Sequence, residues 1–174
     1  MATRLRPTPS NRVGLRGAAA AVARMSFPLP EPMRLALAEA SAAVADGEVP
    51  VGAVVTRDGK VLAVARNRMR VGCDPTAHAE MVALRLAAEA LGSSRLDGCD
   101  LWVTLEPCAM CAGAIALARL SRLYFGASDP KGGAVLHGPR LFGQPTCHHV
   151  PEVYSGIGET EAGAMLRDFF RLRR

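Results

Sequence analysis

The sequence has few aromatic residues and no hydrophobic run long enough to cross a membrane. Phe, Trp and Tyr make up 5% of the 174 residues, so the core must be built largely from Ala, Val and Leu. No stretch approaches the roughly 18 consecutive apolar residues that a spanning helix needs. With 49% hydrophobic and 21% charged residues, the composition is typical of a globular chain. We therefore expect a protein without a membrane span and, at this length, essentially one folded domain.

Acidic residues and lysines are absent from positions 1–30, which carry five arginines. The formal net charge of +5 comes from this segment, because residues 31–174 hold 16 basic and 16 acidic residues. We interpret residues 1–30 as a disordered extension or as sequence upstream of a true start at Met25, although a transit peptide has a similar composition. The folded domain would span residues 31–174, and any RNA-binding face in it must come from local clustering of basic groups.

The cysteine pattern does not indicate a disulfide scaffold. The five cysteines do not show the dense, even pattern of a small secreted domain. Two of them, Cys108 and Cys111, form a C-x-x-C motif, and a histidine suited to the same site occurs earlier in the chain. This combination favours metal or redox chemistry in a reducing compartment, and we expect the cytoplasm.

Periodicity and turn signals predict alternating helices and strands. Apolar residues at helical spacing predict a helix over about 32–46. Two β-branched runs joined by Asp-Gly at 58–59 predict a hairpin. The tripeptide Asp-Pro-Thr at 74–76 predicts the start of a helix that carries His78 and stops near Gly92.

The second half of the chain continues this alternation. The expected elements are a buried strand at 100–105, a helix over about 108–119 with Pro107 at its start, a strand at 122–126, a long Gly- and Pro-rich loop at 128–150, a short strand within 151–156 and a closing helix at 159–171. There are no internal repeats. The order predicts an α/β fold with three α/β/α layers around a central mixed sheet of about five strands.

The residues that carry chemistry gather at two predicted helix starts. Cys108 and Cys111 lie three residues apart in a first helical turn, so both sulfurs can face one ion, and a helix N-terminus favours the thiolate that zinc binds. His78 can join them, and Glu80 can share their pocket only beyond the end of its own helix. Three ligands leave the fourth position of a catalytic zinc to water, with Glu80 placed to move protons. Glu106, which precedes the second helix, is interpreted as structural.

Two other sites could use the same cysteines. One is a redox C-x-x-C pair, and the other is a closed structural zinc site that takes Cys73, Cys99 or Cys147 as its fourth ligand. Neither requires the H-x-E motif at positions 78–80. The composite H-x-E…P-C-x-x-C, with 26 residues between the glutamate and the proline, favours the catalytic site.

This composite motif resembles that of the zinc-dependent cytidine-deaminase-like family. Within the family, the similarity is to the branch that deaminates adenosine in tRNA. It covers about residues 32–174 and rests on EVPVGAV (48–54), DPTAHAEMVALR (74–85), LWVTLEPCAMCAGAI (101–115), FGASDPKGG (125–133) and DFFRLRR (168–174). The resemblance implies hydrolytic deamination of the wobble adenosine of a tRNA anticodon, giving inosine and ammonia. It also implies a homodimer whose partner subunit helps line the pocket.

The resemblance further implies a role for each matching residue. His78, Cys108 and Cys111 would hold one Zn²⁺, and Glu80 would deprotonate the attacking water and protonate the ring and the leaving amine. Asn67 and the backbone around Ala79 would orient the base. The remaining implied substrate contacts are Asp129, Lys131, His149, Phe170, Arg173 and Arg174. Of the two adjacent phenylalanines of the last helix, we expect at least one to be buried in the core and the other to be free to stack on a base.

Two other functions could use the same residues. A free nucleobase or nucleoside deaminase, acting on guanine or cytosine, would use the same zinc site; the Asp-x-Lys at 129–131 and the Phe-Phe-Arg ending argue against it. A non-catalytic, zinc-stabilised RNA-binding module would have no use for Glu80. The segment AVLHGPRLFGQPT (134–146) departs from the family's loop pattern, so no RNA contact is predicted there.

Overall fold

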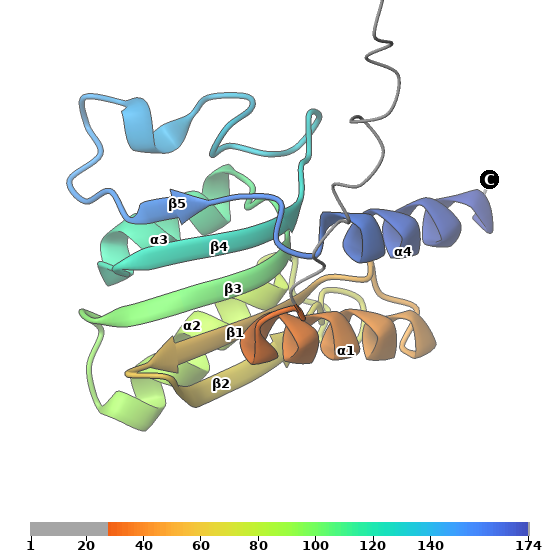
Figure 1. Ribbon diagram of the computed structural model, residues 1–174, viewed down its shortest axis with the longest axis horizontal. Helices are drawn as coiled ribbons and strands as arrows, with labels where there is room; N and C mark the ends of the chain where they lie inside the picture. Colours follow the sequence, from red (N-terminus) through yellow and green to blue (C-terminus); the bar gives the residue numbers. More distant parts are fainter. Residues whose placement is uncertain (1–27, 174) are drawn as a thin grey trace, which may run out of the picture.

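The computed structural model describes residues 28–173, and the expectations for residues 1–27 and for Arg174 lie outside the described residues. Five strands and four helices follow one another in the order that the sequence predicts (Figure 1). Their bounds are α1 Glu31–Ala45, β1 Gly52–Arg57, β2 Lys60–Arg66, α2 Ala79–Leu91, β3 Cys99–Leu105, α3 Ala109–Ala118, β4 Arg122–Ala127, β5 Glu152–Tyr154 and α4 Glu159–Arg171. A short 3-10 turn at Leu141–Gly143 lies in the long loop between β4 and β5.

The sheet is mixed, with the strand order β2-β1-β3-β4-β5. Strand β1 pairs antiparallel with β2 and β3, whereas β3, β4 and β5 run parallel. The hairpin between β1 and β2 turns through Asp58 and Gly59, whose φ angles of 50° and 75° are those of a tight left-handed turn. Because β3 and β4 are parallel, the segments that follow them leave the same edge of the sheet. That edge is where the chemistry-bearing residues lie.

Helices cover both faces of the sheet, which confirms the three-layer α/β/α fold. Helices α1 and α4 lie on one face and α2 and α3 on the other (Figure 1). The core is rich in Ala, Val and Leu, as the scarcity of aromatic residues requires, and Phe125 is its largest fully buried side chain. Helix α1 packs so close to β1 that a Cβ at Gly52 would overlap the carbonyl oxygen of Ala36. No helix between residues 28 and 173 has the length and apolar character that crossing a bilayer requires.

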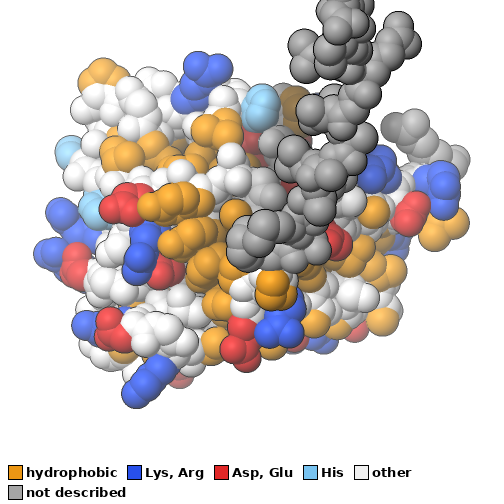
Figure 2. Space-filling model, in the orientation of Figure 1, with side chains coloured by type: hydrophobic (Ala, Val, Ile, Leu, Met, Phe, Trp, Pro, Cys, Tyr) orange, Lys and Arg blue, Asp and Glu red, His pale blue; other side chains and the backbone are white. Residues whose placement is uncertain are grey.

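The face that carries α1 and α4 also holds an aromatic stack. The parallel register places Trp102, Tyr124 and Tyr154 side by side on β3, β4 and β5. Their ring centroids are 3.8 Å and 4.8 Å apart, with nearly parallel planes. Figure 2 shows hydrophobic side chains gathered over β3 and β4 on this face. Cross-strand pairing of this kind stabilises the half of the sheet that ends at the functional edge.

Two helices begin later than the sequence suggests. The Asp-Pro-Thr signal forms a turn rather than a helix start, because Asp74 Oδ1 accepts hydrogen bonds from the backbone N–H and the hydroxyl of Thr76 at 2.8 Å and 2.7 Å. Helix α2 then starts at Ala79, with His78 as its extended N-cap (φ −64°, ψ 152°). Helix α3 starts at Ala109, so Pro107 lies before the N-cap residue and is not the first residue of the helix. Both corrections place His78 and Cys108 at N-cap positions, just before the first residue of a helix.

Candidate active site

Two helix N-termini converge at the edge of the sheet where β3 and β4 end. Cys108 is the N-cap residue of α3, as His78 is of α2, and Cys111 lies in the first turn of α3. The Nδ1 atom of His78 lies 3.6 Å from the Sγ atom of each cysteine. All three ligand atoms lie within 4.8 Å of one another. The structure therefore brings together the predicted ligand set.

The spacing of these atoms suits a tetrahedral zinc ion. With Zn–S bonds of about 2.3 Å and Zn–N bonds of about 2.0–2.1 Å, tetrahedral angles separate nitrogen from sulfur by roughly 3.6 Å. A hydrogen bond from the Cys111 thiol, together with the bond to His78, lowers the pKa of Cys108 to about 4. The hydrogen bond to Cys108 and burial raise the pKa of Cys111 above its ordinary value. Cys108 is therefore readily present as a thiolate, whereas zinc binding must displace the proton of the Cys111 thiol.

Glu80 lies beside the three ligands. It is the second residue of α2 and is only 4% exposed. Burial, which disfavours the charged form, raises the pKa of its carboxyl group above the usual range. A carboxyl group with a raised pKa holds a proton more readily than a solvated one, which suits a group that accepts and returns protons. Its environment is that of an acid–base group rather than of a solvated side chain.

A cavity of about 240 Å³ opens in front of these residues. This volume is below the roughly 300–1,000 Å³ of typical small-ligand pockets, so it suits one flat ring rather than a whole nucleoside. Its polar walls include His78, Glu80, Cys108, Asn67 and Asp129. Apolar side chains from β3, from the segment before β1 and from the loop after β2 complete it. The cavity therefore has the size of a nucleobase, and the three residues that could bind a metal lie at one side of it.

Asn67 is buried at the end of β2 and lines this cavity. Its side-chain Oδ1 accepts a hydrogen bond of 2.9 Å from the backbone N–H of Ala79. Within residues 28–173 no further hydrogen bond of this side chain is found, so its amide nitrogen can donate into the cavity. Asn67 thus lines the site, and the backbone of Ala79, which does not line it, holds the Asn67 side chain in place.

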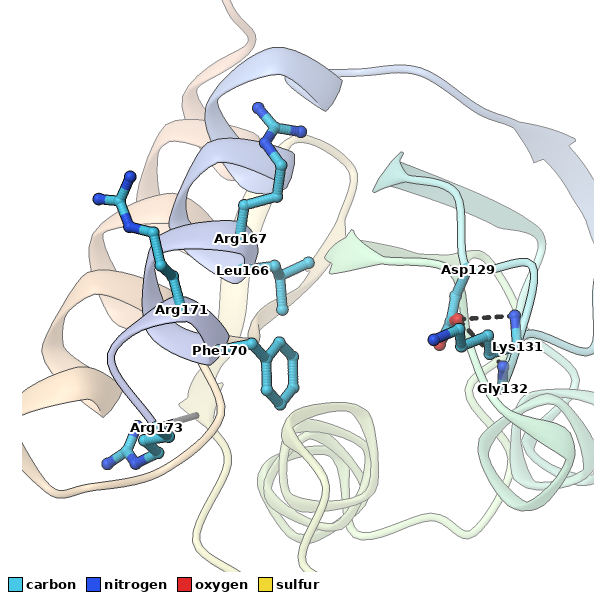
Figure 3. Close-up of a pocket in the computed structure, with 8 residues that line it drawn as sticks. All are labelled: Asp129, Lys131, Gly132, Leu166, Arg167, Phe170, Arg171 and Arg173. Atoms are coloured by element: carbon cyan, nitrogen blue, oxygen red, sulfur yellow. Dashed lines mark hydrogen bonds between the residues drawn. The ribbon is translucent and has the colours of Figure 1, made fainter.

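A larger groove of about 1,030 Å³ adjoins the cavity. Asp129 and Gly132 line both hollows, so the two share a wall. Figure 3 shows the loop residues of this wall facing Leu166 and Phe170, which project from α4. The arginines that line the groove are Arg167, Arg171 and Arg173. An exposed aromatic ring among basic side chains is typical of surfaces that bind single-stranded RNA.

The other predicted substrate contacts have different surroundings. Phe170 is 49% exposed in the groove and Phe169 only 6% exposed, so the buried member of this pair is Phe169. Lys131 is exposed at the groove. Arg173 is tied to the protein by a 3.2 Å bond to the carbonyl of Gly47 and lies 3.6 Å above the Phe169 ring.

His149 is not brought to the site. Its Nε2 atom forms a 2.6 Å hydrogen bond with the carbonyl of Leu120, which precedes β4. The cavity lies beyond the opposite end of that strand. Within this chain, His149 therefore holds the long loop against the sheet at the edge remote from the zinc ligands.

Glu106 lines the cavity, and its carboxylate accepts hydrogen bonds from other residues of the chain. Burial alone would raise its pKa, but hydrogen bonds from the backbone N–H groups of Asp129 and His137 and from the His137 imidazole bring it down to about 2. This agrees with its interpretation as a structural carboxylate.

The sequence reasoning missed two residues at the site. Arg167 lines the groove three residues before Phe170 on α4, and this helical spacing could have indicated it. His137, the partner of Glu106, lies in a stretch without periodicity and gave no signal.

Comparison with known proteins adds independent evidence. The sequence model of the MafB19-like deaminase family matches residues 30–174. The tRNA-specific adenosine deaminase of Agrobacterium fabrum is 59% identical over 142 residues, which cover 82% of this chain and 93% of the relative. A solved structure from work on A-to-I editing by tRNA A34 deaminases at the wobble position superimposes with a TM-score of 0.77. It is 58% identical and covers 78% of this chain and 98% of its own. The guanine deaminase of Nitrosomonas europaea is more distant, at 26% identity and a TM-score of 0.68, covering 79% of this chain and 82% of its own.

Proposed function

We infer that this chain, which belongs to the tRNA-specific adenosine deaminases within the MafB19-like deaminase family, converts adenosine to inosine at the wobble position of a tRNA anticodon. The reaction is a hydrolysis that consumes water and releases ammonia. The observation that carries this function is the buried Glu80 beside the His78, Cys108 and Cys111 group, in a base-sized cavity that opens onto a basic groove.

The residues of the cavity divide the chemistry among them. His78, Cys108 and Cys111 would hold zinc, which when bound supplies the acidity that makes water reactive near neutral pH. Glu80 takes a proton from the attacking water and passes it to the ring nitrogen next to C6. It then takes the remaining proton of the added hydroxyl group and delivers it to the exocyclic amine, which leaves as ammonia while the new C–O bond becomes the carbonyl of inosine. The raised pKa of Glu80 suits a group that briefly holds a proton in each of these two transfers.

The base and its flanking nucleotides would be held by different parts of the site. The Asn67 amide nitrogen would donate to the ring within the cavity, and the backbone N–H of Ala79 would keep this side chain in place through its bond to Asn67 Oδ1. Outside it, the Phe170 ring offers a stacking surface for an unpaired base, and Lys131 and Arg171 offer positive charge to phosphates. A bent single strand could thus place one nucleotide in the cavity and its neighbours in the groove.

The decisive experiment compares substrates. Zinc-loaded protein is incubated with an anticodon stem-loop carrying adenosine at the wobble position, with the same stem-loop carrying that adenosine one position away, and with free adenine, guanine and cytosine. We expect inosine in the first RNA and little or no product from the others. Turnover confined to a free base would contradict the proposal and favour a nucleobase deaminase, the activity of the structural relative from Nitrosomonas europaea.

We also propose that the enzyme is a homodimer. Leu117 on α3 is 79% exposed and borders a hollow of about 270 Å³ formed with the long loop. A large exposed apolar side chain beside a hollow is typical of an association surface.

Replacement of Leu117 by Asp is expected to convert a dimer to a monomer, because a charge would then be buried at the interface. Light scattering coupled to size exclusion should give twice the chain mass for the wild type and one chain mass for L117D. Val61, which is 42% exposed on β2 and lines none of the hollows described above, provides the control, and V61D should stay dimeric. A monomeric wild type would contradict this assembly.

We place the enzyme in the cytoplasm. All five cysteines are free thiols, and Cys73 is exposed to solvent. Exposed thiols persist in reducing compartments, which supports this location.

A further inference from the structure

The side chain of Glu106 is the centre of a hydrogen-bond cluster that organises the loop after β4. The Oε1 atom accepts three successive backbone N–H groups, from Val135 at 3.2 Å, Leu136 at 2.8 Å and His137 at 3.0 Å. The Oε2 atom accepts the N–H of Asp129 at 3.0 Å and lies 2.7 Å from Nδ1 of His137. A carboxylate can only accept, so the imidazole carries its proton on Nδ1. Five donors from one loop thus point at one buried carboxylate.

The same loop is fastened to the helix start that bears the zinc ligands. The backbone N–H of Ala134 donates to the carbonyl of Pro107 at 2.9 Å, and Gly133 forms a bridge with Cys108. A Cβ at Gly133 would lie 2.7 Å from Glu106 Oε1, so only glycine lets the loop wrap this closely. The loop backbone, the carboxylate and the metal-binding segment therefore form one packed unit.

This unit carries the wall that the cavity and the groove share. Asp129 and Gly132 line both hollows, and Lys131 lines the groove. The carboxylate of Asp129 is itself fixed, because its Oδ1 accepts the backbone N–H groups of Lys131 and Gly132 at 3.0 Å each. Figure 3 shows these two bonds at the edge of the groove that faces Phe170. The hydrogen bonds to Glu106 hold the loop in place, and the loop in turn positions the wall that the cavity and the groove share.

We propose that Glu106 and His137 are positioning residues for RNA capture: they hold the loop at residues 129–137 so that the cavity and the groove can bind one RNA strand together. This inference rests on the proposed deamination of a tRNA anticodon. Neither side chain acts on the base. His137 supplies the one side-chain donor of the cluster, and its side chain is 37% exposed, so it can be replaced with less damage to the fold than the fully buried Glu106.

The test replaces His137 by Ala, which removes the donor, and by Asn, whose amide nitrogen can occupy the place of Nδ1. In H137A the KM for the anticodon stem-loop should rise about tenfold, corresponding to ~1.4 kcal/mol, with kcat within about twofold of the wild type. The zinc content should not change. H137N should restore most of the affinity. Amide hydrogen exchange at residues 135–137 should be faster in H137A than in H137N.

Val150 provides the control, because it is an exposed residue of the same long loop and lines neither the cavity, the groove nor the hollow beside Leu117. V150A should keep the wild-type KM. An unchanged KM in H137A, or a fall in kcat alone, would overturn the inference, as would loss of zinc from H137A. If the wild-type protein formed no inosine in the stem-loop, the proposed function would fail instead, which is a separate outcome of the same assay.

Discussion

Replacement of Glu80 by Gln is expected to lower kcat for inosine formation by roughly 10²–10⁴-fold, the usual contribution of a general acid–base group. Glutamine has the same shape, so the buried position stays filled and no cavity destabilises α2. It cannot accept a proton from water or deliver one to the leaving amine. Single-turnover measurements on the anticodon stem-loop would separate this chemical step from binding.

Two further measurements make the result specific. Zinc content should stay at one ion per chain in E80Q, because Glu80 is not among the ligand atoms, and the stem-loop should bind with close to wild-type affinity. Glu89, an exposed residue near the far end of the same helix, provides the control, and E89Q should keep the wild-type kcat. Wild-type kcat in E80Q would contradict the assigned role of Glu80 in proton transfer.

The group of His78, Cys108 and Cys111 could be predicted because each part of it belongs to a short sequence motif. The spacing of Cys108 and Cys111 determines that both lie at one helix start, whichever residue begins the helix. His78 comes from a different helix, yet the H-x-E motif identified it. Both helices start later in the structure than the sequence suggests, and at α2 the reason is that Asp74 uses its carboxylate to close a turn with Thr76. A turn and a helix N-cap share the same residue preferences, so the sequence alone could not separate them.

The groove and its wall were harder to predict because they depend on contacts between distant segments. Phe169 and Phe170 are adjacent, and helical periodicity alone did not decide which of them faces the core. The packing of α4 against α1 and β4 decides it. Glu106 and His137 are 31 positions apart in the chain, and no pattern links them. His149 lies at the remote end of β4 for the same reason, since nothing in the sequence fixes the path of the long loop.

Replacement of Cys111 by Ser is expected to abolish both zinc binding and inosine formation. The thiol is fully buried within the ligand group, and a serine hydroxyl is a poor ligand for an ion that prefers thiolate and imidazole. Metal analysis should find close to no zinc in C111S, whereas the wild type binds one ion per chain. Since metal binding to a formed site adds to folding free energy, the melting temperature should also fall, by about 2–4 °C for each kcal/mol lost in a domain of this size.

The control and the rescue distinguish a catalytic zinc from the two other uses of a C-x-x-C pair. Cys73 is exposed and outside the ligand group, so C73S should keep zinc and activity, whereas it would lose zinc if Cys73 completed a closed structural site. Wild-type protein stripped by a chelator should regain activity when zinc is added, and C111S should not. If a reductant rather than zinc restored the stripped wild type, the pair would be a redox couple. Because the ligand atoms already have the separations that tetrahedral zinc requires, recovery should depend on the metal alone.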